Sequence, residues 1–332
     1  MSNLPFIETF VIKKKAYGIY LMNNFSQHEI TLFLKSFYNS FGFRSGLDKD
    51  FFNWFYTKKP SGYCNNYVLV DVEKDNWIGG FGFSKSNYLI NGEMFKGGLA
   101  VNGFINPGYE GLGLYTKLIS CAVNKEEFQE RVAFSFPHSA NVASIKGHTK
   151  NGFSLLSKLE FYETLIIGGG LDGDGEIQEN DFSALLTLDF EEFLYEREFS
   201  FTRSYEELNW RFAIRNDKNY SLLVINENAL NGYIILGYYK TASAVNRCHI
   251  ADYRYNSIDT LIELIKRAKR LAKEKKCNVL DILINPVSDL INIFIEDGFK
   301  SRKEGYNLFT YSQINHSIPN SASVTFGDFD VV

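Results

Sequence analysis

The chain has 332 residues, 45% of them hydrophobic and 16% aromatic, which is enough apolar material for the packed cores of two domains of ordinary size. Its 35 basic and 39 acidic residues give a formal charge of −4, so the composition provides no global attraction to nucleic acid or to an anionic membrane. The 4 cysteines lack the short spacing of a metal site or a disulfide framework, and we expect them to be reduced core residues.

Residues 1–15 place their apolar side chains before their basic ones and lack a small-residue cleavage site, which is the reverse of a secretory signal. No apolar run in the sequence approaches the length of a membrane span. The sequence therefore predicts a cytoplasmic protein that binds neither membrane nor nucleic acid and holds no metal.

The same order of features, an Asn-Trp pair, a hairpin of two apolar strands, a short helix and a Gly-Phe pair, occurs twice along the chain. These pairs and predicted strands are residues 53–54, 67–72, 77–83 and 152–153, and then residues 209–210, 220–225, 232–239 and 298–299. The repetition favours duplication of one unit, with coincidence of common residue types as the alternative. The glycine-rich run 168–183 is the natural boundary or an exposed excursion, so we predict domains at 1–170 and 171–332.

The run from Phe104 to Ile119 predicts a strand that enters a glycine-rich turn and continues as a helix. Without side chains at Gly111 and Gly113, the backbone can approach a ligand closely, and the unpaired amides of the helix start offer donors and partial positive charge to an anion. The hydroxyl of Thr116 adds one more donor. The turn is therefore predicted to hold a phosphate, and an ordinary strand-to-helix turn without a ligand is the alternative.

Residues 110–115 resemble the Gln/Arg-x-x-Gly-x-Gly/Ala motif of the GNAT acyltransferases, which in that family grips the pyrophosphate of acetyl-CoA. Residues 141–144, followed by 151–153, are similar to the second cofactor segment of the same family. The resemblance implies an α/β fold of two GNAT-like units, each with a mixed, mostly antiparallel central sheet flanked by helices. Glu110 and Tyr115 depart from the motif, and we expect the Glu110 carboxylate to turn away from the phosphates.

The resemblance assigns acyl-CoA, as a co-substrate, to one group of residues. They are Phe104, Ile105, Glu110, Gly111, Leu112, Gly113, Leu114, Tyr115, Thr116, Asn141 and Ser144. It also implies that a backbone amide at residues 103–105 stabilises the thioester oxygen as that oxygen gains charge. Asn141 and Ser144 would share a helix face and bind pantetheine or water, with a helix cap and a surface hydroxyl as the alternative.

Two histidines and Asn141 are the candidates for catalytic roles. His148 lies four residues before Gly152, where many members of the family carry a tyrosine that protonates the departing thiolate, so it could act as that acid or as a proton shuttle. His138, which precedes Ser139, is expected where the chain leaves the sheet beside the cofactor. The alternative for both histidines is a neutral ring that completes a hydrogen-bond network.

The candidate acceptor-binding residues are Ser139 and several aromatic residues, for which core packing is the alternative. These aromatic residues are Trp54, Tyr56, Phe81 and Phe83. In the second half, residues 248–260 run into the predicted amphipathic helix 261–276 without a glycine turn, so only the first half is expected to bind a cofactor.

The pattern resembles tandem GNAT proteins whose second repeat shapes the acceptor site, and among them the enzymes that acylate dTDP-linked amino sugars, as in O-antigen or capsule biosynthesis. This resemblance implies an N-acyltransferase that moves an acetyl or 3-hydroxybutyryl group from acyl-CoA by direct attack of the amine of a dTDP-amino-dideoxyhexose. Three alternatives stay open: a GNAT acetyltransferase for another small amine, a FemX-like aminoacyl transferase, and a non-catalytic module that senses acyl-CoA. The acyl chain, the acceptor and the oligomeric state are not specified by the sequence.

Overall fold

The computed structural model describes residues 4–22, 25–42, 48–62, 64–126, 132–166, 179–188, 190, 193, 199–214, 219–227, 230–241, 243–312, 318–319 and 322–328. The strands are β1 (Phe6–Ile12), β2 (Lys15–Met22), β3 (Cys64–Asp71), β4 (Asn76–Ile90), β5 (Glu93–Ile105), β6 (Val132–Ser135), β7 (Ser154–Leu165), β8 (Phe199–Phe201), β9 (Tyr220–Glu227), β10 (Leu230–Lys240), β11 (Asn246–Tyr255), β12 (Val279–Ile284), β13 (Lys300–Ser312) and β14 (Ala322–Ser323). The helices are α1 (Gln27–Phe41), α2 (Lys49–Thr57), α3 (Leu114–Lys125), α4 (Val142–Lys150), α5 (Tyr205–Leu208), α6 (Ile258–Glu274) and α7 (Ile291–Glu296), with the short helices η1 (Phe182–Thr187), η2 (Asn209–Ala213) and η3 (Phe326–Asp328).

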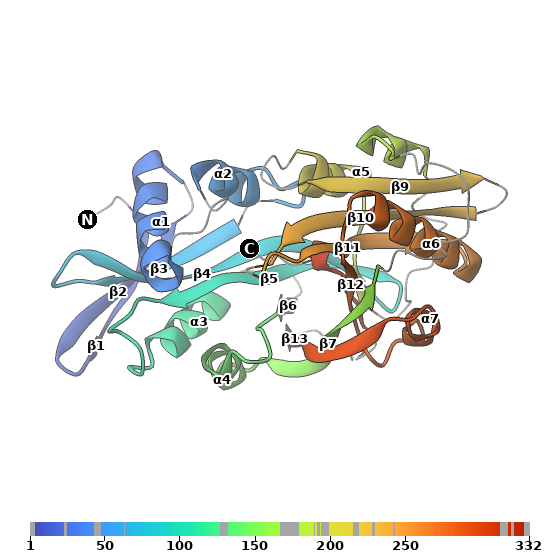
Figure 1. Cartoon of the computed structure of the whole chain (residues 1–332). Helices are drawn as coiled ribbons and strands as arrows, with labels where there is room; N and C mark the ends of the chain where they lie inside the picture. Colours follow the sequence, from blue (N-terminus) through green and yellow to red (C-terminus); the bar gives the residue numbers. More distant parts are fainter. Residues whose placement is uncertain are drawn as a thin grey trace.

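A single mixed sheet runs through the molecule in the order β1-β2-β3-β4-β5-β6-β13-β7-β12-β11-β10-β9 (Figure 1). Along this path the neighbours are antiparallel except for the pairs β5–β6 and β11–β12. The predicted α/β class, with a mostly antiparallel sheet flanked by helices, is confirmed. The two predicted hairpins are also confirmed, as the antiparallel pairs β3–β4 and β9–β10.

Apart from the edge strands β1 and β2, the two sides of the sheet have the same pattern, with three antiparallel strands, β3-β4-β5 or β9-β10-β11, before a parallel pair. On one side the parallel pair β5–β6 is followed by β13, and on the other side the parallel pair β11–β12 is followed by β7. Strand β13, from the second predicted unit, therefore lies between β6 and β7 of the first. The glycine-rich boundary run falls mainly on residues 167–178, which lie outside the described residues, and the division at residue 170 stays a prediction.

The two tryptophans that mark the sequence repeat meet in the structure. Trp54 in α2 and Trp210 in η2 stack with ring centroids 4.7 Å apart and an interplanar angle of 16°. Each indole N–H donates to the backbone carbonyl of the other residue, at 2.8 and 3.1 Å. Such reciprocal contacts are what a two-fold axis between equivalent segments produces, so the pair supports the duplication hypothesis.

Helices cover both faces of the sheet because successive side chains of each strand point in opposite directions. On β3, Val68 packs in the core beneath α1 and α2, whereas Tyr67 and Leu69 pack in the core beneath α3. Figure 1 shows α1 and α2 on one side of this part of the sheet and α3 on the other. Among the helices of the described residues, none combines the length and the apolar character that crossing a bilayer requires.

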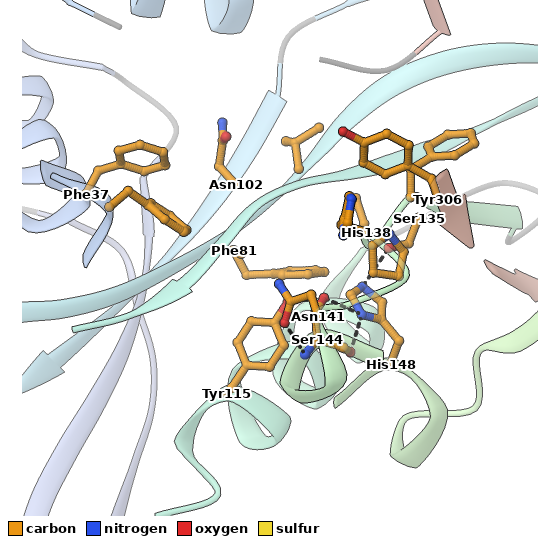
Figure 2. A pocket seen from close by; sticks show the side chains of 16 residues that line it. Phe37, Phe81, Asn102, Tyr115, Ser135, His138, Asn141, Ser144, His148 and Tyr306 are labelled. Atoms are coloured by element: carbon orange, nitrogen blue, oxygen red, sulfur yellow. Dashed lines mark hydrogen bonds between the residues drawn. The ribbon is translucent and has the colours of Figure 1, made fainter. Parts of the chain in front are cut away.

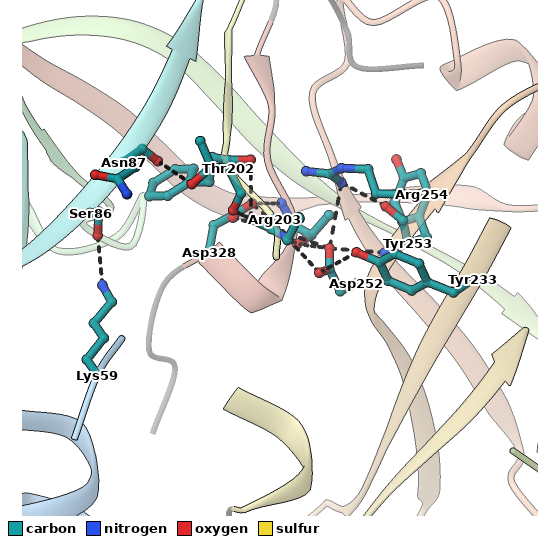
Figure 3. A network of polar contacts seen from close by, with 12 residues as sticks. Lys59, Ser86, Asn87, Thr202, Arg203, Tyr233, Asp252, Tyr253, Arg254 and Asp328 are labelled. Carbon is teal, nitrogen blue, oxygen red and sulfur yellow. Dashed lines mark hydrogen bonds and ion pairs between the residues drawn. The ribbon is translucent and has the colours of Figure 1, made fainter. Parts of the chain in front are cut away.

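A buried ionic network joins the segment that follows β8 to β11 and η3 (Figure 3). The guanidinium of Arg203 binds Asp252 through Nε at 2.6 Å and also forms an ion pair with Asp328. The side chains of all three residues are at most 6% exposed. Burial alone would raise the pKa of Asp252, but Arg203 and Arg254 more than offset this effect and hold its pKa below the usual value.

Candidate active site

The sheet opens between the parallel strands β5 and β6. Their pairing covers only Gly98 with Ala133 and Leu99 with Phe134, although β5 continues to Ile105. At the opening β5 carries a bulge, because the residues between Val101 and Phe104 face a single residue of β4, and Asn102 adopts a left-handed φ of 50°. Side chains and backbone at the end of β5 are therefore turned toward a cavity instead of a neighbouring strand.

Two cavities meet at this opening. One, which we call the strand cleft, has a volume of about 290 Å³ and lies between the ends of β5 and β6. The other, which we call the turn cleft, has a volume of about 320 Å³ and lies between the glycine turn and α4. Five residues line both clefts and form their common wall: Phe41, Gly103, Tyr115, Asn141 and Ser144.

The glycine turn leaves the N-terminus of α3 open. Gly111 and Gly113 have φ values of 72° and 75°, and a Cβ atom at either position would meet nothing within 4 Å. Gly113 is the N-cap and supplies no side-chain hydrogen bond, and the first helical bond runs from the N–H of Lys117 to its carbonyl. The amides of residues 114–116 therefore lie at a helix start without intrahelical partners, beside open space that suits an anion.

Charged side chains around the turn cleft complement this arrangement. The carboxylate of Glu110 accepts the N–H of Gly108 at 2.6 Å, so it bonds within the turn, in line with the expectation that it turns away from a bound phosphate. Across the cleft, α4 contributes the exposed lysines Lys146 and Lys150. The side-chain amide of Asn151 donates to the carbonyl of Thr116 at 3.0 Å and ties α4 to α3.

Tyr115 fills the gap between β5 and α4. A Cβ atom at Gly103 would approach its hydroxyl to 2.4 Å, and one at Gly147 would approach its ring to 2.6 Å, so these two glycines make room for the side chain. The hydroxyl lies 3.4 Å from the Ser144 hydroxyl, in the wall that both clefts share. Burial raises the pKa of Tyr115 to about 12, and the phenol therefore keeps its proton at neutral pH.

His148 has both ring nitrogens engaged (Figure 2). Nδ1 lies 2.8 Å from the Ser144 carbonyl, which can only accept, so the ring proton is on Nδ1. Nε2 is then an acceptor, and the hydroxyl of Ser135, 2.9 Å away, donates to it. Burial lowers the pKa of His148 to about 4, although the bond to Ser144 opposes the shift. The neutral ring thus carries no proton on Nε2.

The other predicted polar residues lie around the opening. Asn141 is the N-cap of α4 and accepts the N–H of Ser144 at 3.1 Å. His138, at the mouth of the strand cleft, accepts the N–H of Ala140 on Nδ1 and packs edge-on against Tyr306 of β13, with centroids 5.3 Å apart. Ser139 does not line either cleft among the described residues, and its N–H donates to the carbonyl of Gly305.

Of the predicted aromatic residues, the structure brings only Phe81 into the strand cleft. Trp54 stacks on Trp210, and Phe83 is 1% exposed in the core beneath α3. Tyr56 is fully buried, but its hydroxyl accepts a hydrogen bond from Asn102, which lines the cleft. These placements correspond to the core-packing alternative for Trp54, Tyr56 and Phe83.

Several residues that line the strand cleft were not predicted from the sequence: Phe37, Phe41, Ser135, Phe136 and Tyr306. Ser135 is the last residue of β6, and a hydroxyl at the end of an apolar strand that precedes the His138 loop was the one available signal. The remaining four give no such signal, because their neighbours along the chain carry no motif.

The equivalent part of the second half is closed. The parallel pair β11–β12 extends over four residues of each strand, from Arg247 with Val279 to Ile250 with Ile282. Helix α6 begins at the N-cap Ser257, whose hydroxyl accepts the N–H of Thr260 at 3.2 Å. Neither an open strand pair nor an uncapped helix start is present in this region of the described chain, and that only the first half binds a cofactor stays a prediction. Among the described residues, no group of three or more His, Cys, Asp and Glu side chains is arranged to hold a metal ion.

No protein-family model and no curated protein matches the chain. Solved structures do match. A GCN5-related N-acetyltransferase from Anabaena variabilis aligns at 13% identity with a TM-score of 0.61, over 88% of this chain and 72% of its own. A probable N-acyltransferase from Enterococcus faecalis aligns at 10% identity with a TM-score of 0.63, over 89% and 72%. N-myristoyltransferase from Saccharomyces cerevisiae, solved with bound myristoyl-CoA, aligns at 12% identity with a TM-score of 0.59, over 93% and 85%. At this level of identity the likeness establishes the architecture: the chain has the GNAT fold.

Proposed function

We propose that this protein is an acyl-CoA-dependent N-acyltransferase. The observation that carries the proposal is the meeting of two different clefts at one wall. The turn cleft offers an uncapped helix start and two lysines, which suit a polyphosphate, and the strand cleft offers aromatic walls and a few polar groups, which suit a small acceptor. The similar structures, two of them named as N-acetyl- or N-myristoyltransferases, support the same function.

In this proposal the pyrophosphate of acyl-CoA is bound by the amides of residues 114–116, with Lys146 and Lys150 close to its negative charge. The pantetheine arm runs along β5 and α4 toward the shared wall. The thioester then lies near Gly103, beside the bulge of β5. Backbone amides in the bulge stabilise the oxygen of the tetrahedral intermediate, because fixed donors at the point where charge develops lower the barrier.

The chemical step is direct attack of the acceptor amine on the thioester carbonyl. The C–N bond forms, the C–S bond breaks, and the thiolate takes a proton from an acid. That acid is restored by the proton that the nitrogen loses as the tetrahedral intermediate collapses, so amine and thioester become amide and thiol. Tyr115 is the proposed donor to the thiolate, since its hydroxyl lies in the shared wall and keeps its proton at neutral pH. Positioning of the two substrates in adjoining clefts supplies a further part of the rate.

We further propose that the acceptor is the amine of a dTDP-linked amino sugar and that the protein acts in the cytoplasm. This part of the proposal rests on the sequence resemblance. Aromatic residues of the strand cleft, among them Phe37, Phe81 and Tyr306, are suited to contact with a sugar or base ring. Tyr306 comes from β13, in line with the proposal that the second unit of 171–332 helps to form the acceptor site while the first unit of 1–170 holds acyl-CoA.

The decisive experiment measures release of free thiol from acetyl-CoA, 3-hydroxybutyryl-CoA and myristoyl-CoA with a panel of dTDP-amino sugars, polyamines, amino acids and peptides. We expect release that depends on both an acyl-CoA and one class of amine. Release with a dTDP-amino sugar alone supports the finer assignment, and release with another amine replaces the acceptor but keeps the reaction. CoA binding without release in the presence of any amine would favour the sensing module, and failure to bind CoA would overturn the proposal.

A further inference from the structure

We propose that Ser135 binds the acceptor amine in the strand cleft, and that the cleft selects a neutral amine carried on an aromatic or apolar group. This inference rests on the proposed function and names the substrate class of the same site. It depends on three features of the cleft: the fixed direction of the Ser135 hydroxyl, the charge of the lining and the position of the shared wall.

The direction of the Ser135 hydroxyl follows from its partner. The Ser144 carbonyl, 2.8 Å from Nδ1 of His148, holds the ring proton on that nitrogen, and Nε2 therefore accepts the Ser135 proton at 2.9 Å. The lone pairs of the Ser135 oxygen are left for the cleft, which Ser135 lines. Ser135 thus accepts an N–H from a bound molecule and does not donate to it. His148 acts through Ser135 and is a positioning residue.

The lining of the strand cleft disfavours a cation. None of the 16 residues that line it in the described chain is Asp, Glu, Lys or Arg. An ammonium group would lose water in the cleft without gaining a counter-ion, so this lining favours the neutral form. A neutral amine avoids this cost and is also the nucleophilic form.

The position of Ser135 relative to the shared wall orients the amine. Ser135 ends β6, whereas Gly103 and Tyr115 form the wall on the β5 side of the same cleft. An amine that donates one N–H to Ser135 keeps its lone pair free to point across the cleft toward the thioester. The aromatic side chains of Phe37, Phe81 and Tyr306 then surround the group that carries the amine.

The test uses the full chain with CoA bound and benzylamine as the probe, with N,N-dimethylbenzylamine, whose neutral form has no N–H, as the matched ligand. Dissociation constants are measured by NMR titration between pH 6 and pH 10. We expect benzylamine to bind more tightly as pH rises through its own ionisation. In Ser135→Ala we expect benzylamine to bind about 3–10-fold more weakly, the loss typical of one hydrogen bond, while dimethylbenzylamine binds equally to both proteins.

Two further variants separate positioning from folding. His148→Gln keeps an acceptor for the Ser135 proton and is expected to retain benzylamine affinity, whereas His148→Phe removes that acceptor and is expected to lose it. Equal benzylamine affinity in wild type and Ser135→Ala, tighter binding at low pH, or no saturable binding to wild type would each overturn the inference. The affinity of the wild-type protein for CoA, measured by calorimetry, distinguishes the two proposals. If the wild type does not bind CoA, the proposed function is overturned. If it binds CoA but gives any of these three results, only the role of Ser135 and the neutral-amine class are overturned.

Discussion

At the scale of single residues, substitutions at the glycines of the turn can distinguish an effect on the backbone from an effect on ligand binding. Gly113 has a positive φ, so any side chain there is strained, but a Cβ atom would meet open space and not another group. A substitution at this position therefore changes mainly what a ligand encounters. Because Asn and Asp tolerate this conformation best and both cap helices well, the helix is expected to survive either change.

Replacing Gly113 by Asp is expected to weaken CoA binding by at least about 10-fold, because the new carboxylate would lie at the helix start where a phosphate is proposed to bind. Gly113→Asn is the matched control, since it has the same size and the same tolerance of positive φ but no charge. Calorimetric titration with CoA compares the two variants. Equal affinities would mean that the phosphates bind elsewhere.

The ring and the hydroxyl of Tyr115 have different proposed roles, packing and proton donation, which a substitution by Phe can distinguish. In Tyr115→Phe the ring still fills the space between Gly103 and Gly147, so CoA affinity and stability should change little, while kcat is expected to fall about 10²–10⁴-fold through loss of the proton donor. An aryl thioester, whose thiolate leaves without protonation, should restore most of the lost rate. A variant that is equally slow with both thioesters would point to a positioning role and not to acid catalysis.

At the scale of secondary-structure elements, the sequence predicted the hairpins and helix starts that depend on residues close together in the chain. Short apolar runs indicated the hairpins β3–β4 and β9–β10, and the glycine turn indicated the start of α3. The helix predicted at 261–276 begins earlier, at Ile258, because Ser257 provides the cap. The insertion of β13 beside β7 was not predictable, because it joins residues more than a hundred positions apart and each strand alone reads as an ordinary apolar segment.

The contact between β7 and β13 depends on Gly305. A Cβ atom there would lie 1.8 Å from the carbonyl oxygen of Leu159, which is backbone and cannot move aside cheaply. Gly305→Ala is therefore expected to lower the free energy of unfolding by about 1–3 kcal/mol or more, through overpacking at the centre of the sheet. Urea denaturation measures the loss, with Ser301→Ala on the same strand as the control. A loss below about 0.5 kcal/mol would show that the two strands separate easily.

At the scale of the whole molecule, the candidate site draws on both halves of the chain. The turn, α3 and α4 come from the segment with the recognisable motif, whereas Tyr306 comes from β13 and reaches the strand cleft only because that strand crosses over. The sequence motif was therefore enough to locate the turn cleft, whereas the strand cleft could be identified only from the three-dimensional structure. The sequence repeat includes both Trp54 and Trp210, which stack on each other in the structure. The repeat alone did not predict this contact.

The Arg203 network, whose members all belong to the second predicted unit, tests how strongly distant segments of that unit depend on a buried ion pair. Arg203→Met would leave Asp252 and Asp328 buried without their main cation, and breaking a buried ion pair in this way typically costs ~3–5 kcal/mol. Arg302 offers the control, because it pairs at the surface with Glu304 at 2.9 Å and with Glu163 at 3.7 Å and lies over the Phe161 ring. Each such partly solvated ion pair is worth ~0–1 kcal/mol, so Arg302→Met is expected to cost much less than Arg203→Met. Urea denaturation of both variants gives the comparison. If the two substitutions cost the same, the Arg203 network does not hold the segment after β8, β11 and η3 together. If Arg203→Met alone is costly and Asp252→Asn together with Arg203→Met recovers part of the loss, the penalty arises from the unpaired carboxylates.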